Sequence, residues 1–376
     1  MNKQRLAVNI MFFTNGFTFA NWVARLPEIR AVYGMTKTQL GTVLLVSAVG
    51  ALCSMPFAGW FAVRFGSSKI TSITAILFCI FLPLVPILEY PSALASILFF
   101  FGLIGGAMDV SMNEQAVLVE KTYEKPIMSS FHAVFSIGTA LGAGSGFLFT
   151  KFGISLFYHF VGIAIFCLIL VLFAIPNLVK VLAKKQVEEK GNAFVLPTKA
   201  ILPLGIIALC GMTGEGSLSD WSAMYLTDVL QKKPDIAALG FFTFAGAMML
   251  GRIFGDKIVE RFKQRNTLIF SSLLALIGLL LAIIFPILPV VFVGFFIVGL
   301  GLSNVVPIVY SSAGNMEGIN PSVGISMAAT IGYTGFFFGP PIIGFLGDTF
   351  GLQIGFCFTL SLFAASCLIT QFNQFN

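Results

Sequence analysis

Apolar stretches recur along almost the whole length of this chain and limit what it can fold into. A helix of about 20 apolar residues crosses the roughly 30 Å hydrocarbon layer of a bilayer. A helix also pairs its backbone polar groups within its own segment, as lipid requires. We therefore predict an all-α integral membrane protein with twelve transmembrane helices, near residues 5–26, 39–62, 69–89, 93–119, 127–150, 154–178, 200–226, 236–258, 267–286, 288–313, 320–346 and 351–371.

The composition excludes a soluble domain. Hydrophobic residues occupy 57% of the 376 positions and charged residues only 10%. The mean hydropathy is +0.95, above what a soluble domain of this length reaches. The first predicted helix begins at residue 5 and runs into NWVAR, which holds no small-residue cleavage site. We expect this segment to be a retained helix and not a signal peptide.

The chain has a formal net charge of +6, and the unequal distribution of Lys and Arg between the two membrane faces explains most of this basic excess. With the N-terminus inside, sixteen Lys and Arg fall on the inner face, at positions 3, 5, 64, 69, 121, 125, 180, 184, 185, 190, 199, 252, 257, 261, 263 and 265. The outer face holds six, at positions 25, 30, 37, 151, 232 and 233. This positive-inside bias, with an even number of crossings, predicts that both termini are cytoplasmic. It gives no reason to expect a nucleic-acid partner.

Cysteine usage predicts neither disulfides nor a metal site. All six cysteines fall inside predicted helices, at positions 53, 79, 167, 210, 357 and 367. They show none of the paired spacings that metal sites use. We expect them to be small apolar packing residues, and we expect no cofactor.

The chain repeats itself once. Its longest polar interval, residues 180–199, carries five Lys and two Glu and predicts a cytoplasmic linker between the sixth and seventh helices. At offsets of 195 to 199, NWVA at 21 matches DWSA at 220, RF at 64 matches RF at 261, and GFLFTKFG at 146 matches GFLGDTFG at 344. Six helices per half give the halves one orientation, a parallel repeat known in transporters. The predicted domains are 1–179 and 200–376.

Two parallel six-helix repeats joined by a charged cytoplasmic loop resemble the major facilitator superfamily over essentially the whole chain. The superfamily's loop signature after the second helix is present in degraded form as GWFAVRFGSSK, with Val63 in place of the acid and Arg64 retained. The second-half loop, GDKIVERFKQR, keeps Glu260 and Arg261. The resemblance implies gating roles for Arg64, Glu260 and Arg261.

Longer motifs are similar to one branch of that superfamily. GGAMDVSMNEQ, MSSFHAVFSIG, EGSLSDWSAMYL, GLGLSNVVPIVYSSAGN and GPPIIGFLGD together resemble the YbjJ-like inner-membrane proteins, which are distantly similar to fucose permease. The resemblance implies solute transport without naming a solute.

Small residues line one face of the fifth and eleventh predicted helices. Gly138 and Gly142 lie four apart in the first half, and Gly335, Gly339 and Pro340 recur in the second. Small residues four apart let two helix backbones approach closely, and Pro permits bending. We predict that the halves pivot along these faces; plain tight packing is the alternative.

The first predicted helix carries a polar face. Asn15, Thr18, Trp22 and Arg25 follow one another at spacings of three, four and three residues, which keeps them on one side of a helix. Asn15 lies near mid-depth, where its amide suits a hydroxyl-bearing solute. We predict that Asn15, Thr18 and Trp22 line a solute cavity, whereas Arg25 is expected at the outer interface.

Acidic and amide residues cluster in the fourth predicted helix. Asp109 and Asn113 share a face; Asp109 is our first-half candidate for carrying a proton, and Asn113 is a candidate for the solute-cavity lining. Glu114 is the second candidate, because His132 on the next helix has a similar depth and imidazole changes charge near neutral pH. The alternative is a static Glu114–His132 hydrogen bond between the two helices.

The stretch GEGSLSDW puts carboxylates into the seventh predicted helix. Glu215 lies near mid-depth between two glycines that tolerate unwinding, so we predict that it carries a proton or binds the solute. A fixed ion pair with a basic partner is the alternative. Asp220 lies near the outer end, where solvation or local capping explains it. Trp221, with Asn304, Tyr310 and Tyr333 further along, completes the predicted cavity lining.

These features predict a secondary active transporter of one small polar solute, with sugar-like compounds as a candidate class. Protons are the expected coupling ion because acids lie in both halves; sodium is the alternative. The 42 Phe residues keep open a proton-driven exporter of amphiphilic compounds. A non-transporting receptor or an enzyme is the third reading, but the chain has only two histidines and no polar interval long enough for a signalling domain. We expect a monomer.

Overall fold

The computed structural model describes residues 3–88, 90–122, 127–180, 201–314, 316 and 321–373. Every regular element in these ranges is a helix, which confirms the predicted all-α class. Apart from residue 180, the predicted linker lies outside the described residues. The chain divides into two compact units: unit 1 is Met1–Met35 with Val43–Glu189, and unit 2 is Thr36–Thr42 with Lys190–Asn376.

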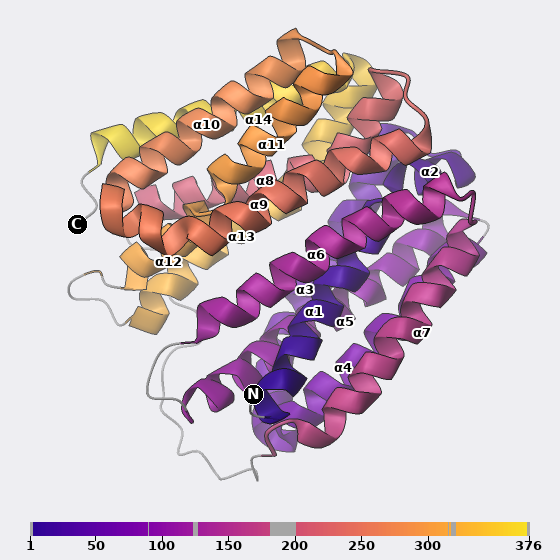
Figure 1. The fold of residues 1–376 in the computed structure, drawn as a ribbon, viewed down its shortest axis with the longest axis vertical. Coiled ribbons are helices and arrows are strands. Elements are labelled where there is room, and N and C mark those ends of the chain that lie inside the picture. The colour runs from indigo at the N-terminus through magenta and orange to yellow at the C-terminus, as the bar shows by residue number, and fades with distance from the viewer. Residues whose placement is uncertain are drawn as a thin grey trace. The chain divides into compact units, whose positions relative to one another are not determined.

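Unit 1 holds the helices of the first half, except that the first turns of α3 belong to unit 2. The predicted crossings are found as α1 (Lys3–Val23), α3 (Lys37–Phe65), α4 (Ser67–Phe81), α5 (Pro91–Glu120), α6 (Met128–Lys151) and α7 (Leu156–Ala174), and the short helix α2 (Leu26–Val32) was not predicted (Figure 1). Two 3₁₀ turns, η1 (Leu82–Ile87) and η2 (Ile175–Asn177), extend α4 and α7.

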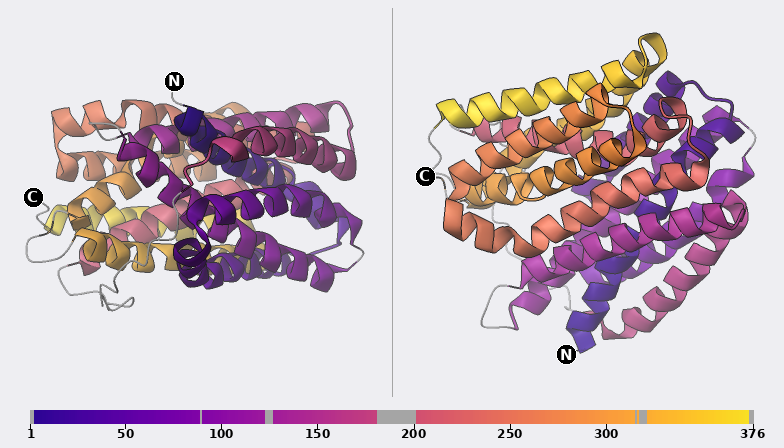
Figure 2. Two further views of the ribbon diagram at one scale, coloured as in Figure 1. Left: turned by 90° about the horizontal axis from the view of Figure 1, so that it is seen from below. Right: turned by 45° about the horizontal axis from the view of Figure 1, so that its top comes forward.

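Unit 2 holds the first turns of α3 and the second set of predicted crossings. These are α8 (Leu202–Asp228), α9 (Pro234–Phe262), α10 (Gln264–Ile284), α11 (Leu288–Leu302), α12 (Val305–Gly314), α13 (Pro321–Thr349) and α14 (Leu352–Phe372). Helix α10 lies beside α11 on one side and α14 on the other (Figures 1 and 2). The crossing predicted at 288–313 is found as one membrane-length segment, Leu288–Ala313, in which the helix is interrupted between α11 and α12.

Proline and left-handed residues set the helix ends. Proline occupies the first turn of α2, α5, α8, α9 and α11, where a helix has no use for the missing N–H. Between α3 and α4, Gly66 turns the chain with φ of +89°, and Lys263 does so between α9 and α10 with φ of +65°. The two residues are repeat partners, since each follows an Arg–Phe pair. The turn is therefore the same in both halves, and only one half has glycine for it.

Each unit is packed around one close helix pair. In unit 1, α1 packs along α6, and in unit 2, α8 packs along α13. A Cβ added at Gly142 of α6 would lie 2.6 Å from the Phe17 carbonyl oxygen, and one added at Gly335 of α13 would lie 2.7 Å from the Leu209 carbonyl oxygen. The backbones meet with no side chain between them.

Ten described segments are long and apolar enough to cross a membrane, by length and composition. Helices α1 and α8, the remaining predicted crossings, are not among the ten. Three Asn and two Thr lower the hydropathy of α1, and four Gly, three Ser and two Thr lower that of α8. The two helices are 21 and 27 residues long, enough to cross a bilayer. Both helices carry predicted site residues: Asn15, Thr18 and Trp22 on α1, and Glu215 and Trp221 on α8.

Candidate functional site

Helices α8 and α9 carry opposite charges that meet inside unit 2. The carboxylate of Glu215 lies 3.6 Å from a guanidinium nitrogen of Arg252. The two side chains are 24% and 22% exposed, so neither charge is fully covered. An isolated carboxylate at this position was the favoured expectation, and the ion pair is the alternative that was raised beside it. Within a membrane-crossing segment, pairing removes most of the cost of either charge.

The glycines around Glu215 have a different role from the one expected. Helix α8 is continuous from Leu202 to Asp228, so Gly214 and Gly216 do not unwind it. A Cβ at Gly214 would collide with the ring of Phe363, and one at Gly216 would lie 3.1 Å from the ring of Phe336. The expectation of an opened helix is wrong. The glycines make room for aromatic rings from α14 and α13.

The helix break lies instead at Ser303–Asn304, between α11 and α12. Asn304 donates hydrogen bonds to the Ser303 hydroxyl at 3.0 Å and to the Gly251 carbonyl at 3.4 Å. Gly251 directly precedes Arg252 on α9. A broken helix inside a transporter exposes backbone groups that can serve a solute or an ion. Asn304, predicted to line a cavity, is here only 7% exposed and closes the break.

The break and the ion pair belong to one cluster. A Cβ added at Gly211, one turn before Glu215 on α8, would lie 2.8 Å from the side chain of Val305, the first residue of α12. Together with the Gly251–Asn304 contact, this sets the break against both charged helices. We call Glu215, Arg252, Ser303 and Asn304 the unit 2 polar cluster.

The other predicted residues of unit 2 are spread over three helices. Trp221 on α8 is fully buried, with its ring edge close to Gly344 of α13, and its indole nitrogen has no hydrogen-bond partner among the described residues. Tyr310 on α12 and Tyr333 on α13 are half-buried, and Tyr333 packs against Phe336. Asp220 is half-buried. Their convergence on one cavity stays a prediction.

In unit 1 the structure brings Asp109 and Asn113 together. The Asn113 amide donates to the Asp109 carboxylate at 3.2 Å and to the Asp109 carbonyl at 2.8 Å, which confirms that the two share a face. Glu114 is half-buried on another side of α5. His132 on α6 has an edge-on contact with the ring of Phe12. A Glu114–His132 proton pair stays a prediction.

The polar face predicted on α1 is buried in unit 1. Asn15 approaches the sulfur of Met112 at 3.7 Å, and Met112 is three residues from Asp109 on α5. Thr18 donates to the sulfur of Cys167 at 3.5 Å. Sulfur is a weak acceptor, so both polar groups are poorly satisfied by the protein. Trp22 is 3% exposed.

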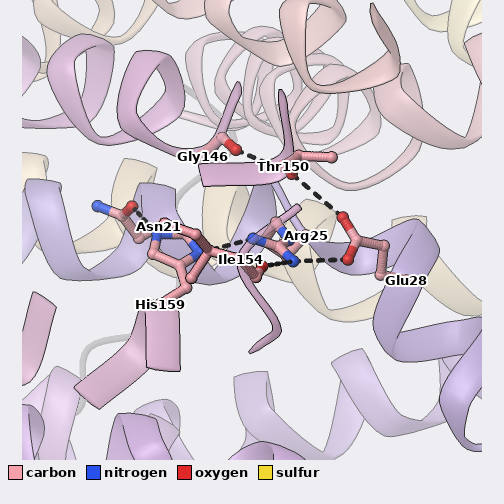
Figure 3. Close-up of polar contacts among 7 residues, drawn as sticks. All are labelled: Asn21, Arg25, Glu28, Gly146, Thr150, Ile154 and His159. Carbon is pink, nitrogen blue, oxygen red and sulfur yellow. Dashed lines mark hydrogen bonds and ion pairs between the residues drawn. The ribbon is translucent and has the colours of Figure 1, made fainter. Parts of the chain in front are cut away.

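A buried network around Arg25 was not predicted (Figure 3). Arg25 is 2% exposed and so is covered by protein, whereas the sequence suggested an interfacial side chain. Its guanidinium lies 2.6 Å from the Glu28 carboxylate, 3.0 Å from the Ile154 carbonyl and 3.0 Å from Nδ1 of His159. Thr150 on α6 donates to the other Glu28 oxygen at 3.2 Å. The network ties α1, α2, α6 and α7 together.

The same network fixes the state of His159. Arginine only donates hydrogen bonds, so Nδ1 of His159 must accept, and Nε2 carries the proton that it donates to the Asn21 side-chain oxygen at 2.8 Å (Figure 3). The Ser145 hydroxyl donates to the same oxygen at 2.7 Å, and the ring of Phe149 stacks on the imidazole. This is a neutral, structural histidine. The sequence held two separate signals: a lone His in an apolar helix, and an Arg–Glu pair three residues apart just after the first predicted helix.

The predicted gating residues lie at close backbone contacts and helix ends. Gly138 and Gly142 pack on α1, and Gly335 and Gly339 pack on Thr213 of α8. Pro340 lies within α13 without ending it. The guanidinium of Arg64 lies 5.7 Å from the ring centre of Phe65, and that of Arg261 lies 5.7 Å from the ring centre of Phe262. Glu260 is exposed. Movement at these positions stays a prediction.

No group of three or more His, Cys, Asp or Glu side chains in the described residues is placed to hold a metal ion. The polar cluster and the Asp109–Asn113 pair offer instead one carboxylate per unit, each with a hydrogen-bonding or charged neighbour. Such an arrangement suits reversible proton or solute binding and offers no nucleophile with an adjacent base.

Comparisons with known proteins agree with this architecture. The family model described as Major Facilitator Superfamily matches residues 8–317. An uncharacterized MFS-type transporter of Yersinia pestis is 33% identical over 96% of this chain and 93% of its own length. The uncharacterized transporter y4wD of Sinorhizobium fredii is 33% identical over 94% of this chain and 93% of its own.

A solved structure shows the same fold at low identity. The nucleoside transporter NupG superposes with a TM-score of 0.76 and 13% identity, covering 99% of this chain and 100% of that one. The relatives and the neighbour are transporters, not enzymes. This chain is a membrane-spanning member of the major facilitator superfamily.

Proposed function

We propose that this protein moves a small polar solute across the cell membrane by alternating access and draws its energy from protons. Family membership supports transport; the Glu215–Arg252 pair is the observation that carries the coupling. Residues 1–179 and 200–376 act as the two moving halves, with 180–199 as the cytoplasmic linker. Both termini face the cytoplasm, the membrane is a bacterial inner membrane, and one copy suffices.

The ion pair supplies a mechanism for coupling. Paired, Glu215 and Arg252 carry no net charge. A proton added to Glu215 removes the negative charge beside Arg252, and the loss of that attraction is costly in a membrane-crossing segment. A solute with acceptor oxygens offsets that cost by accepting hydrogen bonds from Arg252. Proton and solute then favour each other's binding, because linkage between two sites is reciprocal. This predicts that the proton and the solute cross the membrane together, in the same direction.

A second acid belongs to unit 1. Asp109 keeps an amide neighbour, Asn113, and lies one turn from Met112, which Asn15 contacts. We assign Asp109 the role of a second protonatable group and Asn15 and Thr18 that of solute hydrogen-bond partners. Trp22, Trp221, Tyr310 and Tyr333 supply ring faces on which a sugar-like or aromatic solute packs.

The alternative functions predict a different direction of proton movement or a different coupling ion. An exporter of cationic amphiphiles would use Glu215 to bind the solute, so that proton and solute compete and move in opposite directions. Sodium in place of the proton would leave the flux unchanged by a pH gradient. These differences make the choice an experimental one.

The test is a flux assay in proteoliposomes that hold a pH-sensitive dye. Pools of sugars, nucleosides, amino acids, vitamins and amphiphilic compounds are added outside under an imposed pH or sodium gradient. Co-transport predicts acidification of the lumen that depends on an added solute. Solute-dependent alkalinisation would favour export instead. Solute uptake driven only by sodium would overturn proton coupling.

A further inference from the structure

Two thiols meet inside unit 1, where α4 packs along α7 (Figure 1). Cys79 on α4 is 1% exposed and Cys167 on α7 is fully buried, and a hydrogen bond joins their side chains. Both are free thiols. The Thr18 hydroxyl on α1 donates to the Cys167 sulfur at 3.5 Å, which helps to hold that thiol in place. The fold thus brings two thiols into direct contact between membrane-crossing helices.

An apolar groove with a volume of about 240 Å³ lies beside this pair. Cys79 forms part of its wall, and Ala164, also in the wall, precedes Cys167 by one turn of α7. The remaining wall consists of hydrocarbon side chains: Ile80, Pro83, Val161, Ala164, Ile165 and Leu168. Ile80 and Ile165 are 47% and 55% exposed, so the groove opens to the outside of unit 1. Exposed aliphatic surface on membrane-crossing helices meets lipid tails, and a molecule that enters the groove from lipid touches the Cys79 side chain.

The groove selects its occupant by charge and by size. An ion placed among hydrocarbon side chains loses its hydration without replacement, so the groove disfavours metal cations and charged reagents. An apolar cavity of about 150 Å³ is large enough to hold benzene, so a groove of about 240 Å³ accommodates an aromatic ring. The occupant that fits is neutral, carries a small apolar group and bonds to two thiols at once.

Neutral organic arsenic(III) oxides have this chemistry. Sulfur is a soft donor that favours soft partners. When such an oxide condenses with two thiols, two As–S bonds form and the bonds between arsenic and its oxygen break. The two thiol protons leave with that oxygen as one water molecule. Arsenic stays trivalent, so the step needs no oxidant or reductant, and it leaves no charge in the hydrocarbon. A disulfide between the same thiols would instead need an oxidant to take up two electrons.

We propose that Cys79 and Cys167 form a binding site for neutral organic arsenic(III) compounds, which reach it from lipid through the apolar groove. Each chain binds one arsenic atom through both sulfurs, and the bound group ties α4 to α7. The two thiols and the wall of the groove are not among the residues assigned to solute or proton binding. The proposal therefore stands or falls independently of the transport function.

The test uses phenylarsine oxide on reduced, full-length protein in lipid nanodiscs, with intact-mass spectrometry as the readout. One phenylarsenic group per chain is expected. A complex with two thiols should survive washing with the monothiol 2-mercaptoethanol and should be removed by the dithiol 2,3-dimercaptopropanol. Cys79→Ser and Cys167→Ser should each lose the wash-resistant adduct. Cys210→Ser, which changes a buried cysteine on α8, should keep it.

A reciprocal variant guards against misfolding of the single substitutions. It keeps only the proposed pair, because the other four cysteines are changed to Ser: Cys53, Cys210, Cys357 and Cys367. This variant should still hold the adduct, and its unfolding temperature should rise on binding, because the pair is assembled only in the folded state. Loss of the adduct here, or the same wash-resistant adduct in Cys79→Ser as in wild type, would overturn the site.

A charged reagent tests the route through lipid. Phenylarsine oxide that carries a sulfonate group should form the adduct at least about tenfold more slowly than the neutral compound, because the groove disfavours its charge. Equal rates for the two reagents would contradict entry through the groove.

Discussion

Glu215 on α8 and Arg252 on α9 lie 3.6 Å apart, and both are partly exposed. The pair lies beside the broken crossing formed by α11 and α12, because Asn304 at the break donates a hydrogen bond to the carbonyl of Gly251, the residue before Arg252. A charge pair beside a helix break gives a transporter one group that accepts a proton and another that donates hydrogen bonds to a solute. The predictions below follow from this arrangement and from the contacts that support it.

Removing one member of the pair should cost more than removing both. Arg252→Gln leaves Glu215 unpaired and is expected to lower the free energy of unfolding by about 1–3 kcal/mol, less than for a fully buried pair because water reaches both groups. Glu215→Gln with Arg252→Gln should recover most of the loss. Thermal unfolding in detergent measures the four members of this cycle. Simple additivity of the two single losses would contradict a coupled pair.

The Arg25 network should be structural. Arg25→Met leaves the Glu28 carboxylate with only the Thr150 hydroxyl as a donor and removes the donor to Nδ1 of His159, and we expect a loss of about 3 kcal/mol in unfolding free energy. Arg25→Lys should be costly too, because an ammonium group cannot reproduce the three contacts of the planar guanidinium. Lys121→Met, at an exposed helix end, is the control. An unchanged unfolding temperature in Arg25→Met would show that the network contributes little.

The α1–α6 contact should tolerate no added side chain. A Cβ at Gly142 would lie 2.6 Å from the Phe17 carbonyl and 2.9 Å from Cβ of Ala20, so Gly142→Ala is expected to destabilise by about 1–3 kcal/mol. Gly162 on α7 has open space around it, and Gly162→Ala should be neutral or stabilising. Comparing the two unfolding temperatures tests close packing. Equal effects would contradict it.

The left-handed turn at Lys263 offers a stabilising change. Its φ of +65° strains any residue with a Cβ, whereas the repeat partner Gly66 meets φ of +89° without strain. Lys263→Gly should raise the free energy of unfolding by about 0.5–1 kcal/mol, and Gly66→Ala should lower it by a similar or larger amount. Opposite shifts in unfolding temperature are expected. A destabilised Lys263→Gly would mean that the Lys263 side chain outweighs the strain.

Periodicity and hydropathy predict the helices of this chain well, because each crossing must bury its backbone in a continuous helix. The break at Ser303–Asn304 was not predicted, although Pro307 marks it: proline lacks the N–H that would bond the Ser303 carbonyl four residues earlier. The break is also stabilised by a hydrogen bond from Asn304 to Gly251 on another helix. The shared face of Asp109 and Asn113 follows from helical spacing alone and is confirmed.

Partners across helices could not be predicted. The sequence predicts Glu215 as an acid within a crossing, but it places Arg252 only among the inner-face charges. A lone Arg within the predicted helix 236–258 was a signal that Glu215 has a basic partner. Arg25 and His159 are 134 residues apart in the sequence, and their contact depends on how the turn between α1 and α2 packs against α7. A single sequence does not show which helices pack together, so it does not predict side-chain partners on different helices.

Proton flux in proteoliposomes tests the central claim most directly, with wild type, Glu215→Gln, Asp109→Asn and the control Lys121→Gln run in parallel on a solute that wild type transports. The account predicts solute-dependent lumenal acidification in wild type and Lys121→Gln, because Lys121 is an exposed residue at the end of α5. It predicts that Glu215→Gln loses this signal, and that Asp109→Asn loses all or part of it. Undiminished, proton-linked transport in both Glu215→Gln and Asp109→Asn would contradict it and leave these carboxylates structural.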